Sequence, residues 1–410
     1  MQGIEAPPFP YETMAALRSM GYKFSNALAD VIDNSIDAGA SNIELYVMPD
    51  SETTDNSYVL IMDDGKGMNK DQLIKAMTIG SSNSKSTDLG KFGMGMKTAS
   101  LSQCDKLIVC SKSSSGEVSV FCWDMDYLKS SNKWLLIKKS FSDLPEVAKN
   151  HIDSVESGTV VMWSSLRAYR DKDPESASKS IDLETLDARQ YLSTVFHKFL
   201  NAEVKGKKVK FTLNKRTLVK AWDPYCTNET NRELLEPVII EVKNKNKVIG
   251  KITFSPVLLP SQDKFSSSSA FHHAAGILKW VDMQGFYFYR NSRLIDFGGW
   301  DRLRAKDEKS KFLRIDVSYT ENSEMDEELA VNVAKQSASI PKSIQPQVDK
   351  LLRDWISHAR SQYSQASDKP DTFREKKYSL AEVEKMLIRV CEPNEKSLVH
   401  KLFLNFSKND

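Results

Sequence analysis

Cysteine is scarce in this chain, and the few cysteines are scattered. The 410 residues include five, and no two of them have the CxxC spacing typical of a zinc site. An odd, widely spaced set in a chain of this length also argues against a disulfide framework. The pattern predicts free, buried thiols in a reducing compartment.

Long apolar runs are also missing. No stretch reaches the roughly 18–20 apolar residues that a helix needs to cross a bilayer. The first residues, MQGIEAPPFPYETM, have neither the basic region nor the apolar core of a secretion signal. We therefore expect a cytoplasmic protein with no membrane partner.

The chain has no large excess of charge of either sign. Its formal net charge is +2, so no global attraction to nucleic acid or to a membrane is predicted, although local basic patches could exist. Hydrophobic residues make up 40% and charged residues 27%, which is typical of a globular chain with a core. The length predicts two or three domains.

The segment YKFSNALADVIDNSIDA, residues 22–38, predicts an amphipathic helix that ends at Gly39. Polar residues recur along it at spacings of four, three and four, and so share one face: Asn26, Asp30, Asp33 and Asp37. Carboxylates on one face repel each other unless a cation, water or hydrogen-bond donors compensate them. The face could be a ligand site or an ordinary solvated surface. Strand-like runs follow at 42–48 and 58–63.

Two glycine-rich segments come next. The first, DDGKGM at 63–68, ends a hydrophobic strand, and its glycines would let a flat ligand approach closely. The second, GKFGMGMK at 90–97, opens a predicted helix, where exposed backbone amides could cradle phosphate oxygens. Neither is specific alone. The first could be an ordinary Asp/Gly turn, and the second is neither a Rossmann fingerprint nor a P-loop.

In this order, the motifs ADVIDNSIDAGA, DDGKGM, SSNSK…GKFGMGMK and SGTVV resemble the four nucleotide-binding motifs of the GHKL ATPase superfamily. That superfamily includes DNA gyrase B, heat-shock-protein-90-type chaperones, histidine kinases, MutL and MORC proteins, and the resemblance is closest to MORC-like and MutL-like ATPases. It implies an α+β chain that binds ATP and Mg²⁺. The expected architecture is a Bergerat-type αβ sandwich, a ribosomal-S5-like αβ transducer domain and a short helical tail.

The resemblance also implies roles for individual residues. Asn34 matches the asparagine that ligates Mg²⁺, and Asp63 matches the carboxylate that accepts a hydrogen bond from the adenine amino group. Asp30 stands where the family usually has a glutamate as general base, so slow hydrolysis is expected. The other implied nucleotide contacts are Asp37, Gly65, Gly67, Met68, Ser82, Lys85, Gly90, Phe92, Gly93, Met94, Gly95, Lys97 and Thr159, with Ser82 and Lys85 in a lid.

The second half resembles the transducer domains of MORC-like and MutL-like proteins. GFYFYRNSRLI, residues 285–295, looks like their strand-and-turn segment. In VNVAKQSASIP, Lys335 is the candidate for a catalytic lysine that reaches the γ-phosphate, with a plain surface lysine as the alternative.

Composition gives the expected domain boundaries. The polar stretch 164–182 suggests a linker, and a strand near 209–213 is assigned to the region after it. We expect an ATP-binding domain at 1–170, a transducer-like domain at 182–365, and a linker with a helical tail at 366–410.

The resemblance implies an ATP-operated clamp. Mg·ATP would order a lid at 79–92, and two protomers would close as a nucleotide-dependent homodimer. The clamp would act on DNA, in repair, restriction or anti-phage defence, with a nuclease or effector protein as a further candidate partner. Lysine-rich runs at 205–210 and 243–247 could bind phosphates or be solvated faces. The alternatives are a heat-shock-type chaperone and an ATP-binding switch without turnover that regulates a partner protein.

Overall fold

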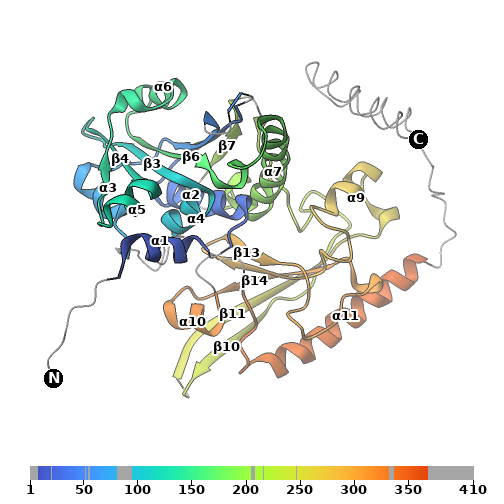
Figure 1. Cartoon of the computed structure of the whole chain (residues 1–410). Coiled ribbons are helices and arrows are strands. Elements are labelled where there is room, and N and C mark those ends of the chain that lie inside the picture. Colours follow the sequence, from blue (N-terminus) through green and yellow to red (C-terminus); the bar gives the residue numbers. More distant parts are fainter. Residues whose placement is uncertain are drawn as a thin grey trace, which may run out of the picture. The chain divides into compact units, whose positions relative to one another are not determined.

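The computed structural model describes residues 8–19, 21–50, 52–53, 56–80, 95–204, 208–215, 217–245, 247–331 and 337–367. The chain divides into two compact units, residues 1–361 and 362–410, and every sheet lies in the first (Figure 1). The predicted helical tail after residue 367 lies outside the described residues. No described helix has both the length and the apolar character that a membrane crossing requires.

The first sheet has eight strands in the order β5-β4-β3-β6-β2-β1-β7-β8, and all neighbours are antiparallel except the parallel pair β1–β7. The central strand β2 is buried along almost its whole length, because helices cover both of its faces. The strands are β1 Asn42–Met48, β2 Tyr58–Asp63, β3 Cys104–Lys112, β4 Val118–Asp124, β5 Ile137–Lys138, β6 Gly158–Leu166, β7 Lys210–Leu213 and β8 Thr217–Leu218.

Helices lie on both faces of this sheet. On one face α2 (Phe24–Asp37) packs against α4 (Gly95–Gln103), α7 (Pro174–Val195) and β2. On the other, α6 (Glu146–Ser154) buries Ala148 and Ile152 against alternate residues of β2 and β6. The remaining helices of this part are α1 Pro10–Arg18, α3 Lys70–Met77, α5 Met125–Ser131 and α8 His197–Leu200.

The structure corrects the assignment of residues 174–213. The stretch 164–182, expected to be a linker, contains the end of β6, the 3₁₀ turn Arg167–Tyr169 and the first part of α7, which follows its cap Asp173 and packs on α2. Its serines and charges form the exposed face of an amphipathic helix, whereas Ala177 and Ile181 are buried. The strand β7, expected in the second region, pairs with β1 in the first sheet, with Phe211 opposite Ile43.

The second sheet has six strands, with β10-β11-β14-β12-β13 in order and β9 paired to β11. The helix α11 covers it, with Trp355 beside Phe254 at a ring-centroid distance of 6.4 Å. The fold is therefore mixed α+β, as expected. The elements are β9 Glu233–Leu234, β10 Val238–Asn244, β11 Lys247–Leu258, α9 Ser268–Ala274, β12 Gly285–Arg290, β13 Arg293–Phe297, β14 Leu313–Tyr319, α10 Ser323–Glu328 and α11 Gln345–Ser367.

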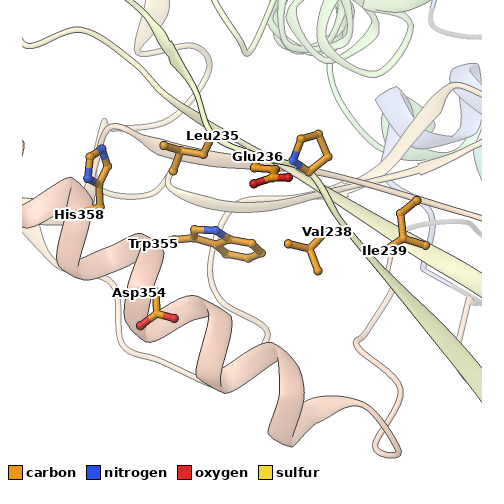
Figure 2. A pocket seen from close by; sticks show the side chains of 8 residues that line it. Leu235, Glu236, Val238, Ile239, Asp354, Trp355 and His358 are labelled. Atoms are coloured by element: carbon orange, nitrogen blue, oxygen red, sulfur yellow. The ribbon is translucent and has the colours of Figure 1, made fainter.

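A groove separates the start of β10 from α11 (Figure 2). Trp355 lies between the helix and the strand, with Val238 and Ile239 on the strand side and Asp354 and His358 on the helix. Among the residues that the structure describes, none that the sequence predicts for the nucleotide site lines this groove.

Truncation of Phe211 tests the new assignment of β7. Phe211 is fully buried and its ring centroid lies 5.4 Å from that of Phe196, the residue that caps α7. We expect Phe211→Ala to lower the free energy of unfolding by roughly 3–5 kcal/mol in urea denaturation. Leu218→Ala on the neighbouring strand, where the side chain is 48% exposed, should cost less than about 1 kcal/mol. Similar losses in the two variants would contradict the packing described here.

Candidate functional site

The acidic face of α2 points mainly into the protein. Asp30 and Asp33 are 3% and 0% exposed, whereas Asn34 is exposed and Asp37 is partly exposed. The Asn34 side-chain amide nitrogen donates to the Asp30 carbonyl oxygen at 2.9 Å. That bond uses the nitrogen within the helix, so the amide oxygen is the atom with which Asn34 could bind a cation. For Asp30 and Asp33, the solvated-face alternative is wrong.

An arginine from the second sheet lies beside these carboxylates. In β13, Arg293 places its Nε 2.8 Å from Asp33 Oδ1 and its Nη2 3.8 Å from Asp30 Oδ1, with 1% of its side chain exposed. Burial alone would lower the pKa of Arg293, but Asp33, Tyr191 and Asp30 outweigh burial and raise the pKa. On the other side, the Tyr22 hydroxyl donates to Asp30 Oδ2 at 2.9 Å.

Arg293 is the residue that sequence reasoning missed. Its segment was singled out as a transducer-like motif, yet the residue received no role. Two features of the sequence pointed to this residue. One is the run of carboxylates in α2, which required a compensating cation, and the other is an arginine directly after a tight turn. Local pattern could not predict that the carboxylates and the arginine lie close together, because about 260 residues of chain separate them.

Asp63 ends β2 as a buried carboxylate with fixed geometry. Its Oδ2 accepts a hydrogen bond from Ser35 Oγ of α2 at 2.7 Å, and its Oδ1 accepts one from the Gly65 amide at 2.9 Å. Burial raises the pKa of Asp63, although the hydrogen bonds from Ser35 and Gly65 oppose the rise. The carboxylate is thus held in one orientation, and α2 supplies one of its donors.

The glycines of DDGKGM allow main-chain segments to approach closely. A Cβ on Gly65 would lie 2.8 Å from the Cβ of Ala38, and one on Gly67 would lie 1.8 Å from the Lys112 carbonyl oxygen. Gly67 also has φ +60°, which side chains disfavour. The turn therefore fits directly against the end of α2 and against β3.

The remaining predicted residues of this turn also come together. The Met68 amide donates to Ser111 Oγ at 2.9 Å, and Ser111 Oγ lies 2.9 Å from Thr159 Oγ1. Thr159 is directly opposite Asp63 in the β2–β6 register. The structure thus brings Asp63 and Thr159 together with the glycine-rich turn.

The start of α4 lies beside Asp30. A Cβ on Gly95 would be 3.8 Å from Asp30 Oδ2, so the acidic residue sits at a helix N-terminus, where phosphate groups commonly bind. Lys97 is buried, and its Nζ donates to the carbonyl oxygens of Ala76 and Thr78 at 2.8 Å each. Burial lowers the pKa of Lys97 to about 8. These bonds stabilise the end of α3, and a phosphate contact by Lys97 stays a prediction.

Several predicted residues fall outside the described part of the chain, in the segments 81–94 and 332–336. They are Ser82, Lys85, Gly90, Phe92, Gly93, Met94 and Lys335. Within the described residues, no three His, Cys, Asp or Glu side chains are grouped to hold a metal. Mg²⁺ often takes only one or two protein ligands and completes its shell with phosphate and water, so a single exposed amide such as Asn34 suits it.

A comparison with protein families identifies the domain that contains this site. Residues 22–159 match the family described as histidine kinase-, DNA gyrase B-, and HSP90-like ATPase. The match begins just before α2 and ends at Thr159, so it covers the first three motifs and the beginning of the fourth, SGTVV. Over these residues the chain is similar to GHKL-type ATPases, as the order of the motifs predicted.

Two curated relatives narrow the resemblance within the superfamily. ATPase MORC2B from Mus musculus is 32% identical over 78 residues, which are 18% of this chain and 8% of that protein. Protein MICRORCHIDIA 3 from Arabidopsis thaliana is 37% identical over 95 residues, 22% of this chain and 16% of that protein. The matches span less than a fifth of either relative. They confirm the predicted likeness to MORC-type ATPases over the residues matched.

The close approach at Gly67 is open to a stability test. Gly67→Ala should destabilise the protein by more than the roughly 1–2 kcal/mol that a left-handed conformation costs a residue with a side chain, because the Lys112 carbonyl must also move. Gly116→Ala is the control: Gly116 has φ +85° but nothing within 4 Å of an added Cβ. Urea denaturation of both variants measures the difference. Equal destabilisation would mean that the turn has room to relax.

Proposed function

We propose that the chain binds Mg·ATP between α2, the end of β2 and the start of α4, and that it hydrolyses the nucleotide slowly. One observation carries the proposal: the same helix places Ser35 against Asp63 and Asp30 against Gly95. The two ends of the predicted site, for adenine and for phosphate, are therefore fixed relative to each other by α2.

At the adenine end, Asp63 would accept a hydrogen bond from the exocyclic amino group of the base, supported by Thr159. Gly65, Gly67 and Met68 would form the wall of this pocket. The carboxylate suits this role because Ser35 and Gly65 already fix its orientation, so little conformational freedom is lost on binding.

At the phosphate end, Asn34 would bind Mg²⁺ through its amide oxygen, and the amides from Gly90 to Gly95 would bind phosphate oxygens, with Phe92 and Met94 between the glycines. Bound Mg²⁺ would offset the charge of the phosphates. Asp30 would polarise the attacking water as general base, directly or through a second water. Asp37, Ser82, Lys85, Lys97 and Lys335 complete the proposed contacts with the nucleotide.

A MORC-like cycle extends this proposal. Nucleotide would order the 79–92 lid and join two protomers into a clamp that acts on DNA, with a nuclease or effector as a further partner. On this chain the DNA proposal is supported by exposed lysines near the β10–β11 turn, Lys243, Lys245 and Lys247. A transducer-like role for the second sheet belongs to the same proposal, as does the domain division.

Substitution of the two carboxylates should separate binding from turnover. Asp63→Asn should weaken ATP binding about ten- to a hundredfold, since it removes a buried charged acceptor. Asp30→Asn should keep ATP affinity and lower kcat by about 10²–10⁴-fold, as is usual for loss of a general base. Calorimetry with a non-hydrolysable analogue and a phosphate-release assay measure the two effects.

Asp64→Asn is the matched control for these variants. This neighbouring carboxylate accepts hydrogen bonds from the Ser41 and Asn42 amides, away from the predicted adenine contact. ATP affinity and turnover should both stay near the parental values. If Asp30→Asn turns over at the parental rate, the base is misassigned. If the parental protein binds ATP with no turnover at all, the binding-only switch is the better description.

The DNA proposal predicts a salt-dependent contact through the hairpin. Replacing Lys243, Lys245 and Lys247 by alanine should weaken DNA binding equally across sequences and reduce the slope of log K against log salt by about 2–3. A mobility-shift assay with a non-hydrolysable ATP analogue measures it. The control triple variant replaces the exposed Lys133, Lys138 and Lys139. Unchanged DNA binding in the hairpin variant would remove the hairpin from the proposal.

A further inference from the structure

The buried cluster around Arg293 joins elements from both sheets. The guanidinium lies against Asp33 and Asp30 of α2, and its central carbon is 5.4 Å from the ring centroid of Phe196, the residue that caps α7. Tyr191 of α7 receives a hydrogen bond from Asn26 of α2 at 3.0 Å. Two helices of the first domain thus surround a cation that belongs to the second sheet.

The turn before Arg293 determines where β13 begins. Arg290 and Arg293 are paired across a two-residue hairpin, and the intervening Asn291 and Ser292 have φ of 46° and 68°. Two consecutive positive φ values are typical of the type I′ turn, which matches the twist of paired strands. Arg290 is fixed in turn by Asp326 of α10, with 3.2 Å between Nε and Oδ1. The hairpin is therefore anchored on both strands.

Asp30 bridges two partners with its two oxygens. Its Oδ1 faces Arg293, while its Oδ2 accepts from Tyr22 and lies beside the start of α4 at Gly95. Asp30 Oδ2 faces α4, so it is the oxygen that could act on a water near bound phosphate. Because the two oxygens belong to one rigid carboxylate, the contact of Oδ1 with Arg293 in β13 also orients Oδ2.

We propose that Arg293 is a positioning residue for ATP hydrolysis: through Asp33 and Asp30 it lets the position of β13 determine whether the carboxylate of Asp30 is aligned to activate water. This inference rests on the proposed function. It makes the second sheet a regulator of the hydrolysis step, while the proposed adenine contact at Asp63 is held by Ser35 and Gly65.

The experiment compares Arg293→Met, Arg293→Lys and Arg290→Met by kcat, KM and analogue affinity. Arg293→Met should lower kcat at least about tenfold and keep KM and analogue affinity within about threefold, because it misaligns Asp30 and leaves the adenine contact in place. Arg293→Lys keeps a cation beside Asp33 and should recover part of the lost kcat. Arg290→Met removes the other buried arginine of the hairpin, which pairs with Asp326, and should lower kcat less than Arg293→Met does.

A double variant separates positioning from folding. Arg293→Met with Asp33→Asn removes a cation and an anion together, so it should recover stability that Arg293→Met loses. We expect kcat to stay low in the double variant. Parental kcat in the double variant or in Arg293→Met would overturn the inference. Should Arg293→Met fail to fold, Arg293→Lys and the double variant carry the same test.

The proposed function and this inference fail in different ways. A parental protein that binds no ATP analogue in magnesium buffer would overturn the proposed function. A parental protein that binds and hydrolyses ATP through Asp30, with kcat indifferent to Arg293, would overturn this inference alone.

Discussion

The pairing of Asp30 and Asp33 with Arg293 is the constraint on which the rest of this structure depends. Two carboxylates and a guanidinium are withdrawn from water, and each would be costly to bury without the others. The pairing therefore requires α2, which packs on the first sheet, and β13 of the second sheet to stay in contact. If one sheet moved so that Arg293 left the two aspartates, a charged side chain would be exposed to water or would stay buried without its partner. A shift of either sheet would therefore affect α2.

The helix α2 transmits this constraint along its length. Its apolar side packs on the first sheet, and this packing fixes its position over β2. Asp30 and Asp33, in the middle of the helix, meet Arg293, and Asp30 also lies beside the start of α4. Ser35, near the end of the helix, donates to Asp63. A ligand that reached from Asp63 to Gly95 would lie between elements that one helix connects. That arrangement favours a site whose ends are set before the ligand arrives.

Local pattern predicted the elements of the first motifs well. The expected strands at 42–48 and 58–63 are β1 and β2, and the expected helix at 22–38 contains α2, because each has a clear period and a terminating residue. Local sequence pattern did not predict the features that depend on contacts between residues far apart in the chain. The polar face of α7 has the composition of a linker, and the parallel partner of β1 cannot be read from its own neighbours. Arg293 was missed for the same reason, whereas the glycine turn after Asp63 was predicted correctly because its residues are adjacent in sequence.

The parallel pairing of β1 with β7 has a consequence for synthesis of the chain. Asn42 pairs with Lys210, a separation of 168 residues (210 − 42). A ribosome must release the whole interval before this edge of the first sheet can form, and contacts so distant in sequence slow folding. Until then β1 presents an unpaired edge, the kind of surface that invites wrong strand pairing. The nascent chain is thus most vulnerable to aggregation during the interval before β7 emerges.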